Sequence, residues 1–180
     1  MTRTIALRAA VPSDAEPLAK LAHQAFVDAF AHYYRPEDLK QFLDEWKTPE
    51  VYARAITDPT TAIQLAEVDG QLAAYCLLKR SYVMDDHPQP HPQRPVFLSQ
   101  LYCAGDMARR GLGGMLMDWA LAQAREWQAD SLSLSVYSEN LGAQRFYQRR
   151  GFVKVADTEF WVGSQRDEEY LYELRLAEQD

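Results

Sequence analysis

The chain has 180 residues, of which 47% are hydrophobic and 25% charged, an ordinary composition for one globular domain with a substantial core. Its 19 basic and 26 acidic residues give a net charge of −7, which argues against nonspecific nucleic-acid binding and mildly favours cationic substrates. Cys76 and Cys103 form no C-x-x-C pair, so we expect neither a metal site nor a disulfide.

No stretch of the sequence approaches the roughly 18 apolar residues of a membrane span. Arg8 interrupts the apolar N-terminal stretch, which argues against an export signal. We therefore expect a soluble, cytoplasmic protein with reduced cysteines and no membrane partner.

The N-terminal part is predicted to form one strand followed by three helices. The strand covers residues 4–10, and the first helix covers 12–30, with Ser13 and Glu16 in capping-box spacing at its start. Two shorter helices follow within residues 33–46 and 48–56. The first begins at Pro36, a residue suited to a first turn, and the second has Thr48 as its cap and Pro49 just inside.

The middle of the chain is predicted to be a hairpin, a loop and a strand. Residues 62–83 form two strands joined by Asp69-Gly70, a strong turn signal. Four prolines in residues 87–95 exclude helix and central strand, so this segment is an extended loop, and residues 96–103 are the next strand.

The C-terminal part alternates helices and strands. The predicted elements are a helix at 111–127, a strand at 131–137, a helix at 139–150 closed by Gly151, and strands at 152–162 and 168–176. The order is β-α-α-α-β-β-β-α-β-α-β-β, with about seven strands and about five helices. Without repeats or linkers, residues 1–180 are predicted to form a single α/β domain.

The segment "MARRGLGGML", residues 107–116, places three glycines in four residues where a strand gives way to a helix. Unpaired N–H groups and the helix dipole make such a junction a phosphate site, and glycine permits close approach. A tight turn that needs positive φ angles is the alternative. No glycine precedes a lysine, which excludes the P-loop, and the dinucleotide fingerprint lacks its third glycine.

A third pattern fits both ends of this region. "ARRGLGG", followed about thirty residues later by "NLGAQRFYQRRGF", resembles the GCN5-related N-acetyltransferase superfamily, whose acyl-CoA loop reads [QR]-x-x-G-x-[GA]. Gly111 and Gly113 match that loop, whereas Ala108 replaces its first residue. The second block of the family is matched by Asn140, Ala143, Phe146, Tyr147, Gly151 and Phe152. The order of elements also matches from residue 4 to residue 176.

The resemblance implies a mixed central sheet flanked by helices and an enzyme that uses acetyl-CoA as cosubstrate, without a metal. The pyrophosphate would be bound by the loop residues Arg109, Arg110, Gly111, Leu112, Gly113 and Gly114. The pantetheine arm and the thioester oxygen would meet backbone groups of Leu101, Tyr102 and Cys103, and Asn140 would contact the same arm.

Tyr147 stands where the family often has a tyrosine that protonates the departing sulfur. An ordinary tyrosine pKa near ~10 suits an acid that stays protonated at neutral pH. The alternative is a packed aromatic residue on a short helix. Ala108 lacks the side chain that often helps to hold the pyrophosphate, but the backbone groups of the loop and the adjacent arginines remain, so we expect binding to persist.

The general base is left unassigned by the sequence. Relatives often carry a glutamate on the strand before the loop, and Phe97 occupies that position. Asp85, Asp86, His87 and His91 in the proline-rich loop are candidates to replace it. For each of them, a solvated surface position is the favoured interpretation.

The acceptor pocket is expected near the first two helices. Phe30, Tyr33 and Tyr34 could form its wall, or they could be core residues. The pattern "YYRPEDL" is similar to bacterial acetyltransferases that act on polyamines and other small amines, and the acidic composition agrees.

The leading hypothesis is therefore acetyl transfer to a small-molecule amine. A protein N-terminal or lysine acetyltransferase and a non-catalytic acyl-CoA sensor are the alternatives. His23 and His32 lack metal-ligand spacing, so no metal is expected. The late strands around Trp161 could form a homodimer.

Overall fold

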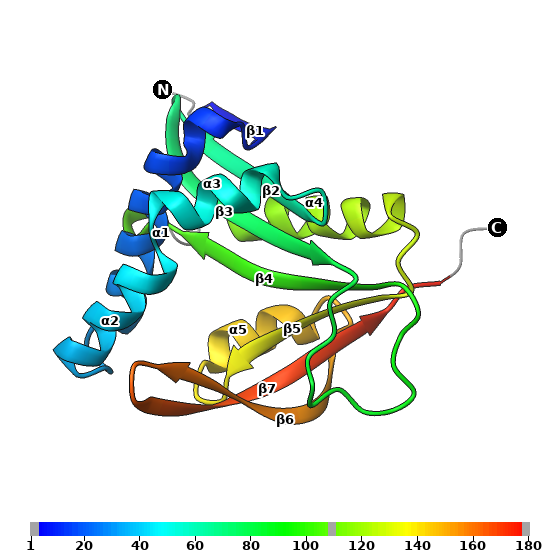
Figure 1. The fold of residues 1–180 in the computed structure, drawn as a ribbon. Coiled ribbons are helices and arrows are strands. Elements are labelled where there is room, and N and C mark those ends of the chain that lie inside the picture. The colour runs from blue at the N-terminus through cyan, green and yellow to red at the C-terminus, as the bar shows by residue number, and fades with distance from the viewer. Residues whose placement is uncertain (1–3, 108–110, 178–180) are drawn as a thin grey trace.

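The computed structural model describes residues 4–107 and 111–177, which contain seven strands and five α-helices in the predicted order (Figure 1). The first six elements are β1 (Ile5–Ala9), α1 (Ala15–Phe30), α2 (Pro36–Trp46), α3 (Pro49–Thr57), β2 (Thr61–Val68) and β3 (Gln71–Arg80). The other six are β4 (Pro95–Cys103), α4 (Leu112–Glu126), β5 (Ser131–Tyr137), α5 (Leu141–Gln148), β6 (Val153–Val162) and β7 (Gln165–Arg175). None of the helices described is long and apolar enough to cross a membrane.

The start of α1 corrects the predicted capping box. A single 3-10 turn, Pro12–Asp14, precedes the helix. The N-cap residue of α1 is therefore Asp14 instead of Ser13. The Asp14 carboxylate accepts hydrogen bonds from the Val11 N–H (2.8 Å) and from the Arg8 guanidinium (2.7 Å). The pattern placed the helix correctly, but the carboxylate at its start binds Arg8 of β1 and Val11 and does not cap the helix. At α3 the predicted cap is present, because Thr48 Oγ1 accepts from the Val51 N–H.

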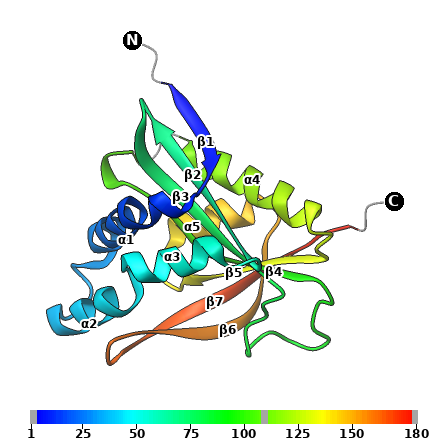
Figure 2. The ribbon, with the colours of Figure 1, turned by 45° about the horizontal axis from the view of Figure 1, so that its top comes forward.

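The sheet has the strand order β1-β2-β3-β4-β5-β7-β6, and only the β4–β5 pair is parallel among the strands described. That pair is short, because its register runs from Pro95–Ser131 to Phe97–Ser133 and then ends. Beyond this point the two strands diverge (Figures 1 and 2). We call this divergence, between β4 after Phe97 and β5 after Ser133, the split.

A β-bulge in β4 accompanies the split. Leu77 of β3 pairs with Gln100 and Leu78 pairs with Leu98, so Ser99 is an extra residue on β4. Bulges bend the strand that carries them and increase its twist. The bulge therefore lies where β4 turns away from β5.

Helices cover the two faces of the sheet differently. Helices α4 and α5 contribute Leu116, Met117 and Tyr147 to the largest apolar cluster, together with Leu132 and Leu134 of β5. On the opposite face, α1 and α3 pack over the strands β2 to β4. We call the face that bears α1 and α3, toward which Tyr102, Ser131 and Asp167 point, the front face.

The loop between β6 and β7 is fixed to α2. Asp38 accepts hydrogen bonds from the N–H (2.7 Å) and the hydroxyl (3.0 Å) of Ser164. Gly163 has a φ of +58°, and a Cβ atom there would lie 2.6 Å from the Cα of Asp38. Only glycine satisfies both the left-handed backbone and this close approach.

We expect Gly163→Ala to lower the free energy of unfolding by about 3 kcal/mol, since it combines left-handed strain with a steric overlap. Gly70→Ala is the matched control, because Gly70 has a φ of +79° and open space around its Cβ position. That change should lower the free energy of unfolding by only about 1 kcal/mol. Equal losses in urea unfolding would show that the contact with Asp38 has no effect on stability.

Candidate active site

The split leaves one side of β4 without a strand partner. Leu101, Tyr102 and Cys103 pair with β3, but none of them has a register partner in β5. Backbone N–H and C=O groups require hydrogen-bond partners, and those on the open side of β4 are available to an extended ligand. These are the residues that the family resemblance assigns to the pantetheine arm.

The three glycines at the start of α4 differ in backbone conformation and in what surrounds them. Gly111 is the N-cap residue of α4 with a φ of +80°, so the turn itself needs glycine. A Cβ at Gly114 would lie 3.1 Å from Nη2 of Arg150, so this glycine makes room for a neighbouring side chain. Gly113 has a helical backbone and no described atom within 4 Å of a Cβ position.

Nothing within the described fold demands glycine at position 113, and a helix would favour another residue there. The open space lies beside the first N–H groups of α4, which have no acceptor within the helix. This arrangement fits a phosphate group of a ligand. Leu112 is buried, so only its backbone can take part in such a site. Ala108, Arg109 and Arg110 lie outside the residues that the structure describes.

Helix α5 brings Tyr147 next to the end of β4. Tyr147 is buried, and its ring lies 5.9 Å from that of Phe152. Burial raises the pKa of Tyr147 above its ordinary value, and the nearby thiols Cys76 and Cys103 add to this effect. The hydroxyl therefore stays protonated at neutral pH. It forms no hydrogen bond with another residue that the structure describes, so its proton is available to a ligand.

The end of β4 also meets the start of α4. The Gly113 N–H points to the thiol of Cys103, which lowers the pKa of that thiol, while burial raises it more strongly. Cys103, Gly113 and Tyr147 thus come together from β4, α4 and α5. Asn140 is the N-cap residue of α5, and its side-chain oxygen accepts from the Ala143 N–H (3.1 Å). The side-chain NH2 group of Asn140 remains available to a ligand.

The predicted acceptor residues occupy different environments. Phe30 and the buried Tyr34 belong to a cluster with Phe26 of α1, and the Tyr34 hydroxyl donates to the buried carboxylate of Asp167 on β7. Tyr33 is exposed. Its ring lies 5.1 Å from that of Tyr137 on β5, so this connection between α1 and α2 spans the split on the front face.

Lys47, at the end of α2, is a buried cation that the sequence analysis did not single out. Its Nζ atom lies 5.4 Å from the ring centroid of Tyr102 and 5.7 Å from that of Phe26, and it donates to Gln100 Oε1 (3.2 Å). Burial lowers the pKa of Lys47 to about 8. A lysine at a helix end normally projects into solvent, and no local pattern distinguishes this one.

Phe97, in the position of the absent glutamate, is buried, with its ring 5.0 Å from that of Tyr82. The solvated position favoured for His87 is wrong. Its side chain is buried, and Nε2 lies 3.0 Å from Oε1 of Glu173 on β7. Glu173 pairs with Ser133, so this contact lies at the closed end of the split.

Asp85, Asp86 and His91 are exposed. Asp86 accepts a hydrogen bond from Thr158 of β6 (2.6 Å). Asp86 thus connects the loop to β6, whereas Asp85 and His91 lie on the surface of the loop.

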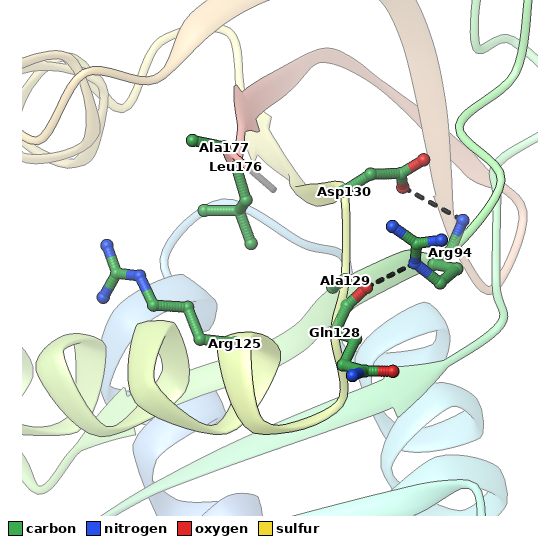
Figure 3. A pocket seen from close by; sticks show the side chains of 7 residues that line it. All are labelled: Arg94, Arg125, Gln128, Ala129, Asp130, Leu176 and Ala177. Atoms are coloured by element: carbon green, nitrogen blue, oxygen red, sulfur yellow. Dashed lines mark hydrogen bonds between the residues drawn. The ribbon is translucent and has the colours of Figure 1, made fainter. Parts of the chain in front are cut away.

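A pocket of about 200 Å³ lies at the far end of α4 (Figure 3). Arg94, Arg125 and Asp130 are among its lining residues, and Arg94 Nε donates to the Gln128 carbonyl. Helix α4 has 15 residues and is therefore about 22 Å long, which separates this pocket from the glycine loop. The chemical groups of the split, not this pocket, define the candidate active site. No group of three His, Cys, Asp or Glu side chains in the described residues could hold a metal ion.

Comparison with known proteins identifies this arrangement. The model of the acetyltransferase (GNAT) family matches residues 23–152. An uncharacterized N-acetyltransferase of Mycobacterium tuberculosis is 33% identical, and the alignment covers 92% of this chain and 99% of that protein. The chain belongs to the GNAT family of acetyltransferases. It is therefore an acetyl-CoA-dependent N-acetyltransferase.

Two further N-acetyltransferases resemble it. The aminoalkylphosphonate N-acetyltransferase of Salmonella typhimurium is 26% identical, over 77% of this chain and 88% of that protein. The PaiA N-acetyltransferase of Thermoplasma acidophilum, solved in complex with coenzyme A, has a TM-score of 0.77 at 19% identity, covering 96% of this chain and 99% of that one. The latter shows that the GNAT fold extends over almost the whole chain.

The open space at Gly113 leads to a first prediction for this site. Gly113→Ala should leave the stability of the free protein unchanged or raise it by up to about 1 kcal/mol, because alanine favours helix. It should also weaken acetyl-CoA binding at least tenfold, since the new methyl group occupies the ligand's space. Gly142→Ala is the matched control, because Gly142 is likewise the second residue of its helix. Thermal unfolding with and without acetyl-CoA measures both effects, and unchanged binding by Gly113→Ala would contradict the assignment.

The buried ammonium of Lys47 predicts a pH effect. Because its pKa falls from 10.5 to about 8 in the folded state, the unfolded chain binds more protons between these values, and stability rises with pH. Relative to Lys47→Met, the wild type should gain about 2 kcal/mol in urea unfolding between pH 7 and pH 9.5. The exposed Lys40 of α2 provides the control, since Lys40→Met should show no such trend. A constant difference for Lys47→Met would contradict the buried charge.

Proposed function

We propose that this GNAT protein acetylates a primary amine of a small molecule by direct transfer from acetyl-CoA, with Tyr147 as the general acid. The observation that carries the proposal is the hydroxyl of the buried residue Tyr147 near Cys103, which is protonated and has no hydrogen-bond partner among the described residues. A proton donor in this position faces the end of the strand whose backbone is open to the ligand.

The donor side of the split suits acetyl-CoA. The space beside Gly113 would take the pyrophosphate at the start of α4, and the open backbone groups of β4 would hold the pantetheine arm in an extended form. A backbone N–H of β4 would then polarise the thioester oxygen. Asn140 supports the same arm through its side-chain amide.

Direct transfer requires the amine nitrogen to attack the thioester carbon. The C–N bond forms, the C–S bond of the intermediate then breaks, and the sulfur leaves with the bonding electron pair. Tyr147 supplies a proton to that sulfur, so that a neutral thiol departs instead of a thiolate. The tyrosine regains its proton from the nitrogen, which must lose one to become an amide.

The acceptor side favours a small molecule over a peptide. The connection between α1 and α2 contacts β5 through Tyr33 and β7 through Tyr34, and Asp38 of α2 binds the β6–β7 loop. These contacts span the front of the split, where an open groove would be needed for a peptide. The related aminoalkylphosphonate N-acetyltransferase, whose name indicates a small amine, supports the same choice.

We expect Tyr147→Phe to lower kcat by about 10²–10⁴-fold, since the phenyl ring preserves packing but cannot donate a proton. Acetyl-CoA affinity should stay within about twofold of the wild type, because the ring is retained. Thiol release with a panel of small amines and calorimetric titration with acetyl-CoA measure the two quantities. The exposed Tyr82 offers a control in Tyr82→Phe. Full turnover by Tyr147→Phe would remove Tyr147 from the chemistry.

A further inference from the structure

One carboxylate oxygen at the split is buried without a partner. Among the described residues, Glu169 Oε2 is the buried side-chain oxygen or nitrogen atom that forms no hydrogen bond. Glu169 also forms no ion pair with a described lysine or arginine. A buried polar atom left unpaired is costly and rare, so a site that retains one indicates a missing partner.

The strand register places Glu169 on the front face. Its neighbours at positions two and four residues away on β7 both point there, because Asp167 binds Tyr34 and Glu173 accepts from Ser131 (2.6 Å). Tyr172 points to the opposite face, where its hydroxyl meets Gln144 of α5. Glu169 therefore lies on the acceptor side of the sheet.

Its position along the split is equally defined. Glu169 pairs with Tyr137, four residues beyond the last β5 residue that still pairs with β4. Four residues of strand correspond to about 13 Å, so Glu169 lies at the open end of the split. The exposed ring of Tyr33 lies over the same Tyr137.

The surroundings of Glu169 are aromatic and acidic. Burial raises the pKa of its carboxyl most strongly, the charge of Asp167 raises it further, and a hydrogen bond from Ser135 of β5 lowers it. The charge of Glu169 in turn raises the pKa of Tyr102 on β4 and the pKa of Tyr34, which precedes α2. On the β6 side its register partner is Thr158, which binds Asp86. The titratable neighbours named here are neutral or negative. The buried ammonium of Lys47 lies on the same face, 5.4 Å from the ring centroid of Tyr102, but it forms no ion pair with Glu169.

We propose that Glu169 is the general base of the acetyl transfer and the residue that selects a cationic amine. This proposal rests on the proposed function above. The ammonium group of the acceptor, R–NH3+, donates a hydrogen bond to Oε2 and then gives that proton to Glu169. The neutral amine attacks the thioester carbon, and the carboxyl later releases its proton to solvent.

The proton balance then closes with the role of Tyr147. One nitrogen proton passes to Glu169, and the second, lost as the amide forms, replaces the proton that Tyr147 gives to sulfur. The products are the amide, the thiol and one released proton. The position of Glu169 also accounts for Phe97, because a base on β7 makes a carboxylate on β4 unnecessary.

The test compares Glu169→Gln with Glu168→Gln, which alters the exposed neighbouring residue of the same strand. At pH 7, Glu169→Gln should lower kcat/KM for a small amine by about 10²-fold or more, while Glu168→Gln stays near the wild type. Acetyl-CoA affinity, measured by calorimetry, should be unchanged in both. The rate of Glu169→Gln should rise only as the pH approaches the pKa of the free amine, so the acid limb of the wild-type pH profile should move up to that pKa.

A wild-type rate and pH profile in Glu169→Gln would overturn the inference and leave the proposed function intact. If the wild type binds acetyl-CoA but acetylates no amine in the panel, the proposed function fails, and the role of Glu169 fails with it. If Glu169→Gln does not fold, Glu169→Asp replaces it. That variant should retain the acid limb with a rate about tenfold lower, and an undiminished rate would count against a positioned base.

Discussion

The short parallel pairing of β4 with β5 is the constraint on which the rest of the structure depends. After three register pairs the strands separate, and the backbone of β4 is left open on one side. A parallel pair needs a crossover, so α4 starts just after β4 and brings its N-terminal N–H groups to the same end of the sheet. Helix α5 follows β5 and carries Tyr147 to that end as well. A single interruption in the sheet therefore places the proposed phosphate site, the open edge of β4 and the proposed proton donor next to one another.

The opposite side of the split is built from polar groups in aromatic surroundings. Gln100 Oε1 accepts hydrogen bonds from the hydroxyls of Tyr52 (2.8 Å) and Tyr75 (2.7 Å) as well as from Lys47. Such networks stabilise a structure only when their members are paired, and they rigidify the elements they join. The network holds β4 against α2 and α3 just beside the bulge. Glu169, with its unpaired oxygen, departs from this pattern, and departures of this kind are expected where a protein trades stability for function.

The sequence was informative where the determining interactions are local. Hydrophobic periodicity, the prolines of α2 and α3, and the Asp69-Gly70 turn gave the order of the elements, and two spaced motifs gave the family. The glycine cluster was recognised, but the separate reasons for its members depend on what surrounds each Cβ position. The start of α1, the burial of His87 and the environment of Lys47 were missed, because each depends on a partner far along the chain. Glu169 was missed for the same reason, since its proposed role follows from the strand register and from the missing hydrogen-bond partner of its Oε2 atom.

The two sides of the site also differ in when a growing chain could form them. The β4 edge, the glycine loop and Tyr147 all lie within residues 101–147. The acceptor side instead requires contacts between the N-terminal helices and the last two strands, with 133 residues between Tyr34 and Asp167 and 126 between Asp38 and Ser164. Contacts of such long separation form late, because the entropy of loop closure must be overcome first. We therefore expect the donor side to form before the acceptor side, which is complete only when the β6–β7 hairpin has packed against the N-terminal helices.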